Sequence, residues 1–164
     1  MGTERCERDR AGTCTSMAPD TCNMPVPSPA GPVPTPTPYV NIAMTNQCMP
    51  ATCSKKVKGM NMAIVTLTSQ ITMSSGNEPG CMPGGVASGM IKGPVSFGKG
   101  SLKVMIEGQP AVFHTCPTKH NGASPNTMGN QGVPTQTTIM VNGLTFDQGF
   151  RPLQTERKII IRTP

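Results

Sequence analysis

Tryptophan is absent from this chain of 164 residues, aromatic residues make up 3%, and charged residues make up 13%, about half of the usual share. Few charges argue against a disordered chain, which needs charge repulsion to stay open. Because aromatic residues are scarce, a core has to be built from Val, Ile, Leu and the 13 Met residues, with Met as a flexible gap-filler rather than a copper ligand. Gly and Pro, 18 of each, predict a turn-rich, all-β domain.

Long apolar segments are also missing. No run approaches the 18 apolar residues of a membrane span, and the N-terminus has no apolar region typical of a secretory signal. We therefore expect assembly in the bacterial cytoplasm, with any later export carried out by a machine. In such a reducing compartment, an odd number of cysteines favours metal ligands and buried small hydrophobic residues over disulfides. The chain has seven: Cys6, Cys14, Cys22, Cys48, Cys53, Cys81 and Cys116.

The positive charge is not concentrated. The net charge of +6 is spread over small clusters such as Lys55, Lys56 and Lys58, and neither this cluster nor the one near the C-terminus is interleaved with aromatic residues. Single-stranded nucleic acids bind through aromatic stacking within a basic groove. We therefore expect no nucleic-acid partner, and interpret the lysines as a solvated face or a contact for an acidic protein.

Seven prolines lie between Pro25 and Pro38. Proline fixes φ and has no N–H to donate, which excludes a helix or an inner strand. We expect residues 18–38, called here the proline strap, to be an extended, polyproline-like segment that lies on the body or covers an edge.

A loose repeat follows the strap. Residues 56–65, 103–113 and 138–146 each read as a short β-prone run, a Gly turn and a second short run, which is a hairpin signature. Long Gly-rich connections separate them at 76–89 and 121–132. No segment has the apolar stripe of a helix. This pattern predicts hairpins in a pseudo-threefold arrangement, with a flat base and with the loops gathered at the other end.

Six motifs in order resemble the PAAR-like domain family, relatives of the proline-alanine-alanine-arginine repeat proteins. The resemblance covers residues 18–143, which leaves 1–17 and 144–164 as short extensions, and the Pro-Ala-Ala-Arg element itself is missing. The Ile run at 159–161 is interpreted as one more strand or as a frayed tail. The motifs are Pro19–Cys22, Gly31–Pro34, Pro38–Met44, Gly76–Gly80, Gly84–Gly89 and Lys119–Gly122.

The resemblance implies a small β-cone at the tip of a contractile injection system, such as a type VI secretion machine. The broad base would sit on a trimeric VgrG-like β-helical spike, one tip per trimer, and the narrow end would transiently meet the target membrane. Many relatives carry a toxin domain after the tip, whereas only about twenty residues follow Gly143 here. A stand-alone tip is therefore expected, and the alternative is an adaptor that tethers an effector to the spike.

Metal binding is expected near the tip. His114, Cys116 and His120 lie within seven residues, and residues i and i+2 point the same way on a strand. Pro117 is expected to break that strand, so that a turn brings His120 back. Imidazole nitrogen and thiolate are the ligands of structural Zn²⁺, although they also admit iron. Spike-tip relatives bind a metal near the apex, and the resemblance makes Cys22 the remaining ligand.

Other cysteines leave alternatives open. Cys48, Cys53 or Cys81 could replace Cys116 in the metal site. Cys48 and Cys53 could equally be buried neutral thiols, and Cys6 with Cys14 could form a pair of their own.

Catalysis is not expected. Cys116 beside either histidine would need an activating partner to act as a nucleophile, and the carboxylates nearest in sequence, Glu107 and Asp147, are not adjacent. The alternative in which the protein is an enzyme would be a small zinc hydrolase.

Overall fold

The computed structural model describes residues 3–4, 12–135 and 140–141, and this part of the chain contains strands and two 3₁₀ turns but no α-helix. The predicted all-β class is confirmed. Six strands form one antiparallel sheet. In spatial order they are β5 (Ile42–Met44), β2 (Thr13–Ser16), β13 (Thr127–Val133), β12 (Pro117–His120), β9 (Val95–Phe97) and β8 (Gln70–Ile71).

The sheet curls until its two edges almost meet. Ile42 of β5 forms a bridge with Ser75, just beyond β8, and Cys48 forms a bridge with Ile71 of β8. The turns η1 (Thr45–Gln47) and η2 (Pro50–Thr52) carry the chain along this seam. A nearly closed barrel results, which leaves few strand edges unpaired.

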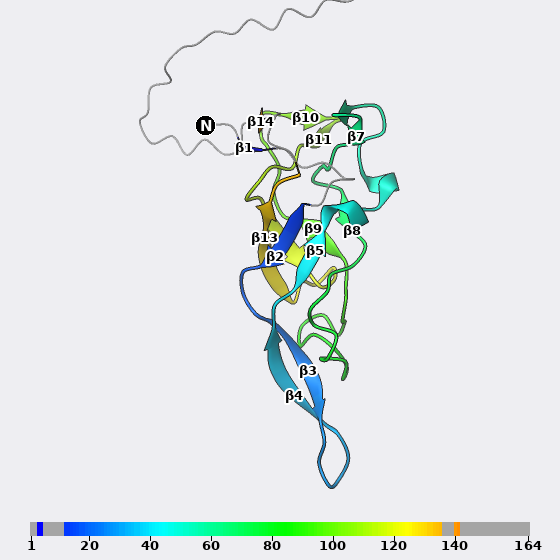
Figure 1. Cartoon of the computed structure of the whole chain (residues 1–164), viewed down its shortest axis with the longest axis vertical. Helices are drawn as coiled ribbons and strands as arrows, with labels where there is room; N and C mark the ends of the chain where they lie inside the picture. The colour runs from blue at the N-terminus through cyan, green and yellow to red at the C-terminus, as the bar shows by residue number, and fades with distance from the viewer. Residues whose placement is uncertain (1–2, 5–11, 136–139, 142–164) are drawn as a thin grey trace, which may run out of the picture.

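Short two-stranded ribbons gather at the broad end of the molecule (Figure 1). Two of them turn on residues with left-handed backbone, Met60 and Asn61 in the first and Glu107 and Gly108 in the second, as tight hairpins require. The predicted hairpins are confirmed there. In the third ribbon the strand at 140–141 pairs with residues 3–4, and its predicted partner, 144–146, lies outside the described residues. The ribbons are β6 (Lys58–Gly59) with β7 (Met62–Ala63), β10 (Met105–Ile106) with β11 (Gln109–Pro110), and β1 (Thr3–Glu4) with β14 (Met140–Val141).

The proline strap forms the narrow end. It folds into a ribbon of β3 (Asp20–Val26) and β4 (Val33–Tyr39), which projects from the barrel opposite the short ribbons (Figure 1). The expected extended backbone is confirmed, but the segment is a hairpin rather than an unpaired polyproline segment. Its prolines explain why pairing survives: Pro34, Pro36 and Pro38 occupy alternate positions. Their nitrogens face away from β3, while the residues between them keep the N–H groups that face it.

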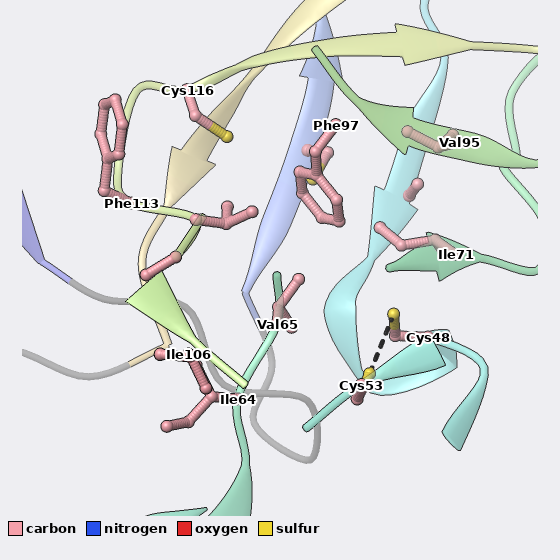
Figure 2. Close-up of a cluster of buried hydrophobic side chains, with 14 residues drawn as sticks. Cys48, Cys53, Ile64, Val65, Ile71, Val95, Phe97, Ile106, Phe113 and Cys116 are labelled. Atoms are coloured by element: carbon pink, nitrogen blue, oxygen red, sulfur yellow. Dashed lines mark hydrogen bonds between the residues drawn. The ribbon is translucent and has the colours of Figure 1, made fainter. Parts of the chain in front are cut away.

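The hydrophobic core lies inside the barrel, toward the broad end (Figure 2). Branched aliphatic residues and two phenylalanines fill it together with buried cysteines. The expectation that methionine would fill it is wrong, because many methionines are exposed, among them Met17, Met44, Met60, Met90, Met105 and Met128. The core cysteines are Cys14, Cys48, Cys53 and Cys116.

The ends of the domain can be placed in part. Strand β2 lies between β5 and β13, so the chain enters the sheet at Thr13, ahead of the expected boundary at residue 18. The expected C-terminal extension, 144–164 with its Ile run, lies outside the described residues. The described part of the chain holds no helix that is long and apolar enough to cross a bilayer.

Candidate functional site

Asp20, the first residue of β3, is fully buried where the narrow ribbon joins the barrel. Its carboxylate accepts hydrogen bonds from three asparagine side chains. The amide nitrogens of Asn41 and Asn77 each lie 2.8 Å from Oδ2, and the amide nitrogen of Asn126 donates to Oδ1. We call these four residues the amide cage. A buried charge is tolerated only when it is well satisfied by hydrogen bonds, and these amides supply that stabilisation.

The amide cage ties together segments that are distant in sequence. The Oδ1 atom of Asn77 accepts from the backbone N–H of Lys92 at 3.0 Å, and Oδ1 of Asn126 accepts from that of Ala87 at 2.8 Å. Asn126 also donates to the carbonyl of Thr21 in β3 at 2.8 Å. All three asparagines thus bind Asp20, and Asn77 and Asn126 also accept a hydrogen bond from the backbone of segment 87–92. The cage fixes the base of the narrow ribbon to the loops around it.

Cys22 lies two residues beyond Asp20 and is also fully buried. Its thiol donates to Oδ1 of Asp20 over 3.6 Å. Burial, together with the charge and hydrogen bond of Asp20, raises the pKa of Cys22 to about 11, so the thiol is neutral at neutral pH. A side chain at Gly80 would collide with the Cβ atom of Cys22, which explains the glycine there.

His120, the last residue of β12, is also fully buried. Its Nε2 atom lies 2.9 Å from Oγ1 of Thr118, while Nδ1 has no hydrogen-bond partner among the described residues. Burial lowers the pKa of His120 to about 4, although the nearby charge of Asp20 acts in the opposite direction. The imidazole is therefore neutral at physiological pH.

The other two predicted metal ligands lie elsewhere. His114 is partly exposed, with Nε2 3.0 Å from the carbonyl oxygen of Gly132. Cys116 belongs to the hydrophobic core, where burial raises its pKa to about 12. The expected break at Pro117 is wrong: Pro117 begins β12, which runs extended to His120. At about 3.3 Å per residue, this strand separates the Cα atoms of Cys116 and His120 by about 13 Å.

The structure thus brings Cys22 and His120 to the same region, around Asp20, and leaves His114 and Cys116 outside it. Cys81, an alternative ligand, is exposed. Within residues 12–135 no three His, Cys, Asp or Glu side chains converge in a way that could hold a metal ion. Both oxygens of Asp20 are already engaged by amides, so this arrangement does not fit a tetrahedral zinc centre. Zinc binding remains a prediction from the sequence.

A second carboxylate organises the broad end. Glu107, in the turn of the β10–β11 ribbon, accepts hydrogen bonds from the backbone N–H groups of Lys55, Lys56 and Val57 at 2.9, 2.6 and 2.9 Å from Oε1. These bonds lower the pKa of Glu107. We call this arrangement the Glu107 clamp. It joins the loop before β6 to the neighbouring ribbon, beside a cavity of about 420 Å³ that Cys53 also lines.

Sequence reasoning missed the amide cage. Asp20, Asn41 and Asn77 each lie within one of the motifs quoted for the family resemblance, so a signal was present. Asn126 carried no such signal. Nothing in the spacing of these residues indicates that amides from three loops meet one carboxylate.

Comparison with known proteins identifies the family. Residues 13–129, most of the barrel and all of the narrow ribbon, match the toxin PAAR-like domain. The chain belongs to this family. It is similar to the DNase toxin Tse7 of Pseudomonas aeruginosa, with 31% identity over 114 residues, which is 69% of this chain and 29% of that toxin. The match therefore spans less than a third of the length of this relative. No solved structure gives a significant match.

Proposed function

We propose that this protein is the tip of an injection spike: its broad end caps a trimeric β-helical spike, and its narrow end leads into the target envelope. The observation that carries the proposal is the tapered shape, with short ribbons at one end and a single proline-rich ribbon at the other (Figure 1). Membership of the toxin PAAR-like family supports it. A single domain on a threefold spike predicts one copy per trimer.

The docking face is assigned to the broad end because exposed apolar side chains lie on or beside its ribbons. Leu102 is 78% exposed, Met105 55% and Met60 45%. Lys56 and Lys58 are exposed near them. Such a face suits a partner with apolar contacts and a few acidic groups. A spike with these features would bury the methionines and pair with the lysines.

The narrow end is suited to bearing load. The amide cage holds the base of the β3–β4 ribbon, and segment 81–86 pairs with the outer edge of β3: the N–H of Asn23 donates to the carbonyl of Gly84 at 2.8 Å, and that of Val86 to Thr21 at 3.0 Å. Fixed φ angles along the prolines reduce bending further. In this proposal the ribbon transmits force to a small area of membrane without a catalytic step.

The decisive experiment measures stoichiometry with the purified trimeric spike by native mass spectrometry. One tip per trimer is expected, and one tip per spike protomer would refute the proposal. Leu102→Asp combined with Met105→Asp at the broad end should abolish binding. Val33→Asp, at an exposed apolar position on the narrow ribbon, is the control and should bind normally.

Metal content is a separate question. Zinc in near-stoichiometric amounts, in protein purified without added metal, would show that Cys22 and His120 recruit further ligands that the described arrangement keeps apart. Metal-free protein with an intact fold would contradict the zinc prediction and would agree with a carboxylate that is satisfied by the amide cage alone. Elemental analysis of the purified protein distinguishes the two.

A second candidate function, carriage of an effector, is favoured by the similarity to a DNase toxin of which the matching region is only a part. In this role the domain would connect a toxin to the spike. Co-purification of a cargo protein with the tip in the absence of the spike would support it. No catalytic role is proposed for the domain itself, because the thiol of Cys116 is buried and neutral. If the protein did hydrolyse an ester or a peptide, and if Cys116→Ser abolished that activity, the result would support the hydrolase alternative instead.

A further inference from the structure

Two core cysteines lie in contact at the seam of the barrel. Cys48 follows η1 and Cys53 follows η2, and their sulfur atoms are 3.4 Å apart, with the thiol of Cys53 directed at Cys48 (Figure 2). A disulfide has an S–S distance of about 2.05 Å. The thiol of Cys53 is already directed at Cys48, so the two sulfurs have to approach by about 1.4 Å to reach bonding distance.

The position of this pair gives it a structural consequence. Residues 45–53 close the sheet: Cys48 bridges Ile71 of β8, and the N–H of Met49 donates to the carbonyl of Gln70 at 2.8 Å. Ser69 Oγ also donates to the carbonyl of Thr52 at 2.8 Å. A covalent bond across η2 would therefore fasten the segment that holds the two edges of the sheet together.

Access is asymmetric between the two thiols. Cys53 lines the cavity of about 420 Å³ at the broad end, together with Thr52 and Lys55. Cys48 lies behind it in the core and does not line that cavity. A disulfide reagent entering the cavity would therefore meet Cys53 first, with Cys48 placed to attack the resulting mixed disulfide.

We propose that Cys48 and Cys53 are a redox-closed clasp: dithiol in a reducing compartment, and disulfide once the protein meets a small-molecule or protein disulfide oxidant. Cys53 reacts with the oxidant RSSR and releases one RSH. Cys48 then attacks the Cys53 sulfur and releases the second RSH. Two electrons and two protons pass from the cysteines to the oxidant, so the step is balanced. The clasp depends on this geometry alone and not on the proposed spike function.

The test uses the full chain with Cys6→Ser and Cys81→Ser, equilibrated with oxidised and reduced glutathione over a range of ratios. Formation of the clasp lowers the intact mass by about 2 Da, for the two hydrogens lost. Cyanogen bromide cleaves after Met49 and Met60, so the fragment ending at Met49 should remain joined to the fragment 50–60 until a reductant is added. We also expect Tm to rise by roughly 5 °C, as for closure of a short loop.

Matched variants separate the clasp from other effects. Cys53→Ser should abolish both the fragment linkage and the rise in Tm. Cys14→Ser, which removes another buried core thiol, should keep both. The chain that carries only Cys6→Ser and Cys81→Ser gives the mass and linkage results without any substitution in the core. Both thiols still alkylated after an oxidising equilibration, or a lasting glutathione adduct on Cys53, would overturn the clasp; a linkage that leaves Tm unchanged or lowers it would overturn its stapling role.

Discussion

The two organising carboxylates of this protein are satisfied in opposite ways. Asp20 is fully buried and binds three side-chain amides, whereas Glu107 lies at the surface and binds three backbone N–H groups. Both join segments far apart in sequence. The two differ in their access to water, because Asp20 is shielded from solvent and Glu107 is exposed to it.

That difference determines what each carboxylate contributes to stability. When Glu107 is lost, water replaces its hydrogen bonds with Lys55, Lys56 and Val57. When Asp20 is lost, buried amides are left without an acceptor, and removing one partner of a buried charged network is strongly destabilising. The base of the narrow ribbon therefore depends more strongly on Asp20 than the broad end, with its apolar core, depends on Glu107.

The largest effect is expected from Asp20→Asn. The substitution keeps the shape of the side chain but turns an amide donor toward the donors of Asn41, Asn77 and Asn126. We expect the free energy of unfolding to fall by about 3–5 kcal/mol, measured by denaturant titration. Glu107→Gln is the control of matched chemistry. A loss below about 1 kcal/mol for Asp20→Asn would show that the amide cage is not the structural centre of this region.

Acidification gives the next largest effect, through His120. Its pKa is about 4 in the folded protein against an ordinary value of 6.5, so the unfolded chain takes up a proton first as pH falls. Stability is therefore lost progressively between pH 6.5 and 4, by about 3 kcal/mol for this group. His120→Gln should remove that part of the pH dependence. Parallel stability curves for the wild type and the variant across this range would contradict the prediction.

Asn77→Ala should have an intermediate effect. It removes one donor to Asp20 and the acceptor of the Lys92 N–H, while two amides remain on the carboxylate. We expect a loss of about 1–3 kcal/mol in the free energy of unfolding. A loss as large as that of Asp20→Asn would mean that the amides act as an all-or-none unit rather than singly.

The smallest effect is expected from Glu107→Gln. Global stability should not change measurably, but the backbone N–H groups of Lys55, Lys56 and Val57 lose their charged acceptor. In the wild type their NMR shifts should titrate at a pH below the ordinary Glu value of 4.5, because these bonds lower the pKa of Glu107. The clamp is thus retained at mild acidity and lost as pH falls through the lowered pKa. Titration at or above the ordinary value would contradict the clamp.

The sequence predicted the hairpins because tight turns have local requirements. Glu107-Gly108 shows this most clearly, and the structure places left-handed backbone at both residues. The first hairpin turns at Met60-Asn61 rather than at Gly59, which lies in β6. The number of glycines in a sequence suggests how many turns to expect. The residues at which the chain turns depend instead on which residues of the two strands pair.

The site was harder to predict because it depends on contacts between distant segments. The cluster of His114, Cys116 and His120 is close in sequence, but β12 keeps its ends apart. Asp20 and Asn126, separated by more than a hundred residues, meet instead. Pairing of β12 with β9 and β13 decides which donors approach each other, and no local pattern contains that information.

The alternate prolines of β4 also affect how the molecule behaves among its own copies. An open strand edge is a template on which further chains can assemble. Along Pro34, Pro36 and Pro38 every nitrogen facing outward lacks a hydrogen, so an incoming strand finds no donors there. A slender projection with two open edges would favour fibre growth. Here the outer edge of β3 is covered by segment 81–86, and the outer edge of β4 offers no hydrogen-bond donors along its prolines.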